Sequence, residues 1–183
     1  MKNLLLTAAL ALLVIGCASE PRINVATASN PAIDLAGVRS YNFIQPLGTD
    51  RPNGVQTPLS AMLMTALNRE MSERGFQRAD KPDLLINVFV STEQQIDVRQ
   101  VPTSTSFYGR RSRYSNWGTA TTTQVRQFTQ GTLAIDVVDA RQNMLAWEGI
   151  AQQRLGRNAQ QVSAEEVDRV VRAIMAEFAY IAN

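Results

Sequence analysis

Three acidic side chains are the strongest candidates for catalysis in this sequence. Asp136 and Glu148 lie in two consecutive strand patterns that a short turn joins, so we expect them side by side on the outer face of the sheet. Asp97, in an earlier strand pattern, is expected on the same face. Two neighbouring carboxyl groups can act as acid and base in a hydrolase. The alternative interpretation is a solvated sheet face on which acidic residues promote solubility.

The composition excludes most other catalytic chemistry. The chain of 183 residues has no histidine and a single cysteine. A histidine-dependent triad, a histidine or cysteine zinc site and an internal disulfide are therefore excluded. The sequence also contains no Gly-x-Ser-x-Gly motif, no glycine-rich phosphate loop and no calcium-binding Asp-x-Asp-x-Asp loop. We expect no metal and no cofactor.

The single cysteine, Cys17, lies where covalent lipid attachment requires it. Residues 4–15 carry no charge and are long enough for the hydrophobic part of a signal peptide, but too short to span a membrane. They are followed by Gly16 and Cys17, and Val-Ile-Gly-Cys is the pattern of a bacterial lipobox. We predict that residues 1–16 are a lipoprotein signal peptide and that Cys17 carries a diacylglycerol and an N-acyl chain. The alternative is a secreted protein with an incidental cysteine.

Lipidation at Cys17 would anchor the chain to a membrane. Two acyl chains give stable attachment where one does not. Ala18 follows the cysteine, at the position where aspartate retains an enterobacterial lipoprotein in the inner membrane, so we expect the periplasmic face of the outer membrane. Residues 17–33 lack a hydrophobic period, and we expect them to form the acylated cysteine and a flexible tether that spans roughly 20–25 Å. Charges of both signs nearly balance, which argues against binding to nucleic acid.

Residues 102–118 combine aromatic and basic side chains with no acidic one. Arginine binds phosphate and carboxylate groups, and aromatic rings suit half-solvated surfaces and sugars. One interpretation is a contact loop for an anionic lipid, lipopolysaccharide, a glycan or an envelope protein. The other is a hairpin tip whose aromatic rings pack on the sheet. The contact residues would be Phe107, Tyr108, Arg110, Arg111, Arg113, Tyr114 and Trp117.

Two helices and four strands must position these side chains. Apolar stripes after the capping hydroxyls of Thr57 and Ser163 predict one helix up to Gly75 and another to the end of the chain. Apolar alternation predicts strands at 38–45, 83–101, 119–139 and 144–155.

Details of these strands can also be predicted. The second strand is long enough that we expect a bend or bulge near Thr92, and Ile96 and Val98 should continue its apolar face. A pairing centred on the turn at 139–143 puts Gly131 beside Ala151, leaving room for a large side chain. Trp147 should be buried on that face.

The order β-α-β-β-β-α predicts an α+β fold of two layers. We expect a mostly antiparallel four-stranded sheet with both helices on one face, forming a single periplasmic domain over residues 34–183. Five segments, in order, resemble the bacterial lipoprotein family catalogued as domain of unknown function 4136. They are 47–51, 74–76, 81–87, 131–140 and 145–149.

The resemblance covers residues 34 to about 180 and implies an envelope lipoprotein, without catalytic or ligand residues to carry over. We therefore expect a non-enzymatic binding or interaction module, anchored to the membrane through its lipid. The alternative is an envelope hydrolase that uses the acidic residues of the exposed sheet face.

Overall fold

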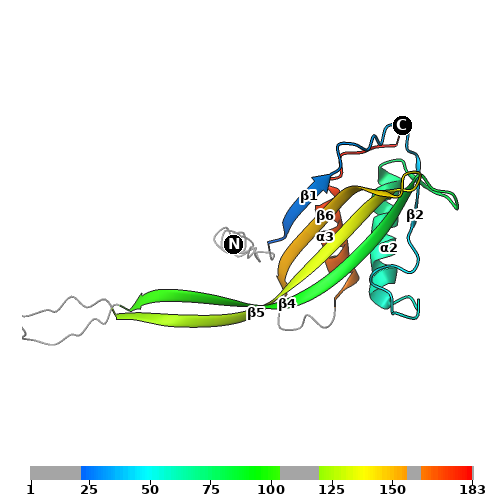
Figure 1. Ribbon diagram of the computed structural model, residues 1–183. Coiled ribbons are helices and arrows are strands. Elements are labelled where there is room, and N and C mark those ends of the chain that lie inside the picture. The colour runs from blue at the N-terminus through cyan, green and yellow to red at the C-terminus, as the bar shows by residue number, and fades with distance from the viewer. Residues whose placement is uncertain (1–21, 104–119, 156–161, 183) are drawn as a thin grey trace, which may run out of the picture.

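A six-stranded sheet with two helices on one face makes up the part of the chain that the computed structural model describes, residues 22–103, 120–155 and 162–182 (Figure 1). The strands lie in the order β1-β6-β5-β4-β2-β3. The α+β class is confirmed. The elements are β1 (Asn24–Ser29), β2 (Ser40–Phe43), α2 (Pro58–Glu73), β3 (Gln77–Arg78), β4 (Leu84–Thr103), β5 (Ala120–Asp139), β6 (Met144–Leu155) and α3 (Ala164–Met175).

The predicted four-stranded, mostly antiparallel sheet is wrong in two respects. The sheet has six strands, and it is mixed, because β2 runs parallel to both of its neighbours, β3 and β4. The two missed strands are β3, which has only two residues, and β1, which pairs antiparallel with β6. Residues 24–29 therefore belong to the sheet and not to a flexible tether. Their side chains are mostly exposed, so backbone pairing holds the strand without an apolar pattern that a sequence could reveal.

Both helices begin as predicted. The Thr57 hydroxyl accepts a hydrogen bond from the backbone N–H of Ser60 at 3.0 Å, and the Ser163 hydroxyl accepts one from that of Glu166 at 3.2 Å. Gly75 follows α2 with a φ of +85°, the left-handed conformation that glycine adopts most easily.

The second helix ends earlier than predicted. α3 stops at Met175, and the Arg74 guanidinium donates to the Met175 carbonyl oxygen. The backbone N–H of Ala182 in turn donates to the Arg74 carbonyl oxygen at 3.0 Å, so the last residues run against the end of α2 instead of extending a helix.

The core lies between the helices and the inner face of the sheet. Trp147 is 2% exposed, as predicted, and its ring packs edge-on against Phe178 at 5.0 Å. The predicted register is wrong by two residues. The turn pairs Asp139 with Met144, one residue beyond the predicted pairing, and an irregularity at Val137/Val138 adds the second shift, so that Gly131 lies opposite Gln153. The small residue beneath the tryptophan is Gly149, where a Cβ atom would collide with the Trp147 ring and with Ile174.

β4 and β5 extend beyond the rest of the molecule (Figure 1). They pair without interruption from Leu84 opposite Asp139 to Thr103 opposite Ala120. The contribution of β6 ends where Leu155 lies opposite Thr129. We call the two-stranded part, residues 95–103 and 120–128, the arm, and the remainder the body. The strands bend where the arm leaves the body, but the pairing near Thr92 contains no bulge.

The predicted apolar face of β4 is buried only within the body. Leu84, Ile86 and Val88 are fully buried under the helices, whereas Ile96 and Val98 of the arm are exposed. The part of the chain described here contains no helix that is both long and apolar enough to cross a membrane.

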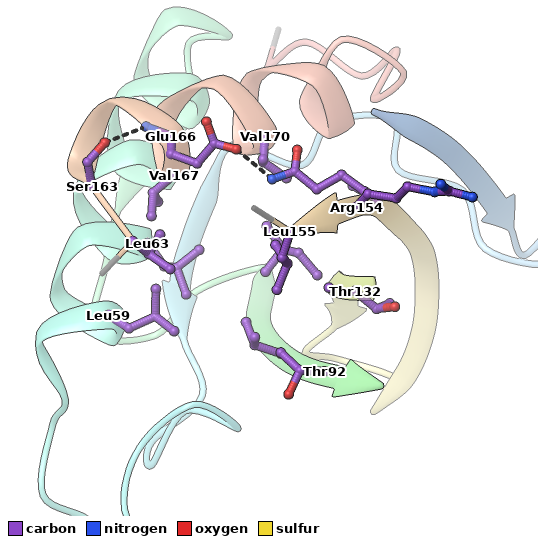
Figure 2. Close-up of a pocket in the computed structure, with 16 residues that line it drawn as sticks. Leu59, Leu63, Thr92, Thr132, Arg154, Leu155, Ser163, Glu166, Val167 and Val170 are labelled. Atoms are coloured by element: carbon purple, nitrogen blue, oxygen red, sulfur yellow. Dashed lines mark hydrogen bonds between the residues drawn. The ribbon is translucent and has the colours of Figure 1, made fainter. Parts of the chain in front are cut away.

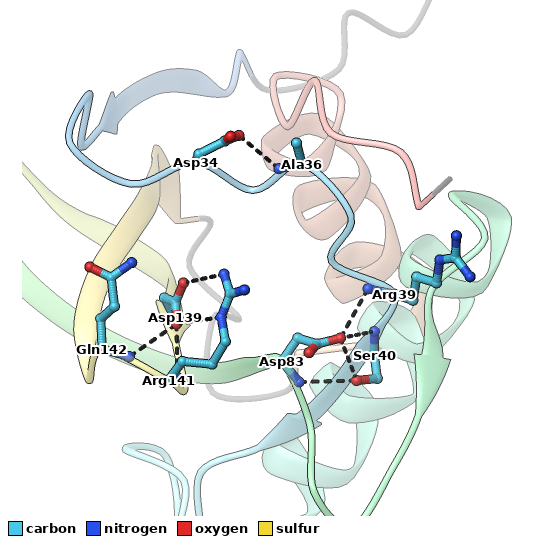
Figure 3. A network of polar contacts seen from close by, with 8 residues as sticks. All are labelled: Asp34, Ala36, Arg39, Ser40, Asp83, Asp139, Arg141 and Gln142. Atoms are coloured by element: carbon cyan, nitrogen blue, oxygen red, sulfur yellow. Dashed lines mark hydrogen bonds and ion pairs between the residues drawn. The ribbon is translucent and has the colours of Figure 1, made fainter.

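Two aspartates fix the ends of the strands opposite the arm (Figure 3). Asp83 accepts hydrogen bonds from the backbone N–H groups of Arg39 and Ser40 and from the Ser40 hydroxyl, at 2.8 to 3.1 Å. Asp139 is fully buried and accepts from the Arg141 guanidinium at 2.8 Å. These bonds, first from the Arg39 backbone and from the Arg141 side chain respectively, lower the pKa of both carboxyl groups.

Candidate ligand-binding cavity

An apolar cavity opens at the end of the body from which the arm leaves (Figure 2). It has a volume of about 400 Å³ and lies between the first turns of the two helices and the inner face of β4, β5 and β6. This volume falls in the range of small-molecule sites, about 300–1,000 Å³. Side chains that line it include Leu59, Leu63, Leu155, Val162, Val167 and Val170.

Strand pairing places small residues in the floor of the cavity. Val90, Leu133 and Ala151 lie in one row across the three strands, and Thr92, Gly131 and Gln153 lie in the next. The Leu155 side chain covers Gly131, where an added Cβ would lie 3.0 Å from it. The small side chains of glycine and alanine leave open space above the sheet at these points. The apolar stripes of the helices form the opposite wall of this space.

The polar side chains at the rim bond to one another. Glu166 accepts hydrogen bonds from Gln153 and from the Arg169 guanidinium, and the Ser163 hydroxyl caps α3. The bond from Arg169, assisted by Gln153, lowers the pKa of the Glu166 carboxyl, so this group is ionised at neutral pH. The Arg154 side chain points away from the cavity, and its guanidinium lies 3.7 Å from the centre of the Phe128 ring.

The structure brings together two of the three predicted acidic residues. Asp136 lies directly opposite Glu148 on β5 and β6. Burial, and then the neighbouring Glu148 charge, raise the pKa of Asp136. Asp97 lies ten residues along β4 from Asn87, the partner of Asp136, which is roughly 33 Å at the rise of an extended strand. Asp97 therefore shares the outer face of the sheet with Asp136 and Glu148, as expected, but lies too far away to act together with them. Among the described residues no group of three potential metal ligands occurs.

The predicted contact residues between positions 107 and 117, and Cys17, lie outside the described residues. The structure does place the two residues on either side of the segment at 104–119. Thr103 and Ala120 form the end of the arm. The arm is nine residues long, or roughly 30 Å, measured from the last residues at which β4, β5 and β6 all pair. The chain between them therefore starts and finishes far from the cavity.

The cavity itself was not predicted. Leu59, Leu63, Val167 and Val170 belong to helical stripes that the sequence shows, but periodicity indicates a buried face and not an incompletely filled one. Two local signals existed: Gly131 within a strand, and Val162 just before the cap of α3. Neither could be assigned to a cavity before the register of β5 and β6 was known.

Comparison with known proteins identifies the family. Residues 25–179 match the family described as Domain of unknown function (DUF4136), and the chain belongs to this family. The resemblance seen in the sequence is thereby confirmed. No curated protein matches the chain.

One solved structure shares the fold at low sequence identity. A PDZ domain protein from Parabacteroides distasonis has a TM-score of 0.56 at 14% identity, and the match covers 88% of this chain and 36% of that protein. The chain thus spans about a third of the length of that neighbour. A PelC dodecamer from Paraburkholderia phytofirmans has a TM-score of 0.47 at 8% identity, covering 87% of this chain and 98% of that one. The likeness to the first protein concerns the fold alone.

Proposed function

We propose that this protein is a non-enzymatic binding module, anchored through Cys17 to the periplasmic face of the outer membrane, and that the apolar cavity is its binding site. The observation that carries this proposal is the cavity of about 400 Å³ between two helices and a sheet. Well-packed protein interiors contain few voids larger than a water molecule. An open apolar cleft of this size supports binding of a ligand as the first hypothesis for function.

The rim of the cavity favours an apolar ligand. Glu166, Gln153, Arg169 and Ser163 already satisfy one another through hydrogen bonds. Thr92 and Thr132, which carry hydroxyl groups, also line the cavity, but most of the lining is apolar, so a sugar or nucleotide would leave several of its polar groups unpaired, each at a cost of about 1–3 kcal/mol. A hydrocarbon meets no such penalty and gains about 0.8 kcal/mol for each buried CH₂ group.

Anchoring is supported by the lipobox. The only cysteine of the chain follows an uncharged segment of signal-peptide length. Cys17→Ala should therefore abolish the uptake of labelled palmitate and leave either an uncleaved or a soluble periplasmic species. A variant that still takes up palmitate would contradict the lipobox.

A hydrolase remains the second candidate, because Asp136 and Glu148 are adjacent and the pKa of Asp136 is raised. Neither residue lines the cavity, however, and they lie on the opposite face of the sheet. One experiment distinguishes the two functions. Joint replacement of both residues by alanine would remove hydrolysis of a wall glycan and would leave the cavity unchanged.

Binding can be tested with a dansyl-labelled undecanoic acid, whose fluorescence rises in an apolar site. The full chain carrying Cys17→Ala avoids interference from the anchor. Thr92→Trp places an indole against the cavity and should weaken binding about tenfold, which corresponds to the loss of roughly two buried CH₂ groups.

Thr123→Trp is the matched control. It makes the same change on the exposed inner face of the arm, outside the cavity lining. Equal affinity of all three chains, or no binding by any of them, would overturn the cavity as the binding site.

A further inference from the structure

The first strand begins beside the cavity. Val25 lies opposite Ala151, which lines the cavity, and Ile23, one residue before β1, packs against the core. Figure 1 shows that β1 starts at the end of the body from which the arm leaves. The chain that leads back to Cys17 therefore leaves the body next to the cavity.

The connection to the anchor is short. Ile23 lies six positions after Cys17, so a fully extended chain could separate their Cα atoms by only about 20 Å. The flexible tether expected up to residue 33 would have let the domain move far more freely, but β1 removes that freedom. Once Cys17 is acylated, this end of the body stays close to the leaflet that holds the acyl chains.

The cavity is mainly apolar and of small-molecule size. The cavity holds about 400 Å³. Exposed apolar side chains of the arm, Ile96, Val98 and Val125, lie on the same sheet face as Val90, but the polar residues Gln94, Gln127 and Thr129 lie between them and the cavity.

We propose that the cavity takes up one acyl chain of a phospholipid from the leaflet in which the Cys17 anchor is embedded. This inference rests on the proposed function, because it needs both the anchor and the cavity as a binding site. Lipid from the leaflet is a more favourable source than the anchor, because attachment of the protein depends on its own acyl chains remaining in the membrane.

Photocrosslinking in vesicles tests the proposal. The full lipidated protein is reconstituted into phosphatidylethanolamine and phosphatidylglycerol vesicles that contain a trace of phosphatidylethanolamine with a diazirine at the end of one acyl chain. After irradiation, lipid-labelled peptides are mapped by mass spectrometry. We expect labels on peptides that contain Leu59, Leu155 or Val167, the residues that line the cavity from α2, β6 and α3.

Two variants and a control make the result specific. Thr92→Trp on the strand side and Leu59→Trp on the helix side should each lower cavity labelling about tenfold, whereas Thr123→Trp on the arm should leave it unchanged. Far-ultraviolet circular dichroism and melting curves check that each variant is folded. Agreement of two variants on opposite walls separates occupancy of the cavity from a local folding defect.

Three outcomes would overturn the proposal. Labels confined to residues 18–23 or to the arm would show that lipid touches the surface without entering the cavity. Cavity labels unaffected by both tryptophan variants would show non-specific contact. Cavity labels that arise when the diazirine is carried only by the Cys17 anchor, in unlabelled vesicles, would identify the anchor as the occupant.

The two proposals can fail separately. If the dansyl fatty acid binds the Cys17→Ala chain but leaflet lipid does not label the cavity, the binding module stands and its ligand is not a membrane phospholipid. If neither probe reaches the cavity, both proposals fail.

Discussion

The same two strands build a stable body and an exposed arm. On the inner face of β4, Leu84 and Ile86 in the body are 0% exposed, while Ile96 and Val98 in the arm are 64% and 59% exposed. The residues are of the same kind and alternate with the same period. The difference is that two helices cover the first part and no described element covers the second. A strand pattern therefore shows which side chains share a face, but not whether that face is buried.

Different interactions hold the two regions. The body rests on apolar packing around Trp147 and the helices. The arm is held by its ladder of backbone bonds and by polar contacts such as that of Gln127 with Gln94 at the edge of the body, at 2.7 Å. A two-stranded ribbon on its own is marginally stable in water. Substitutions should therefore act strongly in the body and weakly in the arm.

The largest contrast is expected from core truncation. Trp147→Ala removes a ring that is 2% exposed and packs against Phe178, and should lower the free energy of unfolding by about 3–5 kcal/mol. Val125→Ala, at a residue of the arm that is 64% exposed, should change it by less than about 0.5 kcal/mol. Urea unfolding of both variants measures the difference. A comparable loss from Val125→Ala would mean that the arm is covered in solution.

Glycine substitutions should give the next largest effect. A Cβ at Gly149 would collide with Trp147 and Ile174, so Gly149→Ala should cost about 1–3 kcal/mol through overpacking. Gly131→Ala brings its methyl group to 3.0 Å from the end of the flexible Leu155 side chain, which can move into the cavity. Thermal melts should therefore show a clear decrease for the first variant and little change for the second. Equal decreases would show that the cavity has no room to accommodate Leu155.

A moderate effect that depends on pH is expected at Asp83. Asp83→Asn weakens the bonds that join the start of β2 to the start of β4, and should cost about 1.5–3 kcal/mol at neutral pH. The pKa of Asp83 is lowered in the folded protein, so its contribution is complete above the ordinary value of about 3.9 and disappears as the pH falls towards the folded value. Unfolding measured from pH 7 down to pH 2 should show a difference between variant and wild type that shrinks with acid. The exposed Asp80→Asn is the control, and a constant difference would contradict the linkage.

Features set by local bonding could be predicted from the sequence. The caps at Thr57 and Ser163 and the turn at Gly75 depend on residues within one helical turn, and all three are confirmed. Burial of Trp147 was predictable from its position in a strand pattern.

Features set by distant contacts could not be predicted. β1 is held by backbone bonds to β6, more than a hundred residues away, and its own side chains carry no signal. The register of β5 with β6 depends on one extra residue near Ala146, which the turn does not reveal. The candidate cavity needs that register and both helices at once, so the sequence indicated its wall residues without indicating a space between them.

The smallest effect is expected from charge removal in the arm. Asp97 lies 3.1 Å from the Arg99 guanidinium and 3.6 Å from that of Arg154, and both arginine side chains are largely exposed. Exposed ion pairs contribute about 0–1 kcal/mol and are screened by salt. Asp97→Asn should therefore leave global unfolding unchanged and should speed amide hydrogen exchange in the arm at low salt, with the difference shrinking at high salt. Exchange in β6 and the helices is the internal control. If the variant instead lowered the melting temperature of the whole domain, the arm would be energetically part of the body, and the separation of the two regions would not hold.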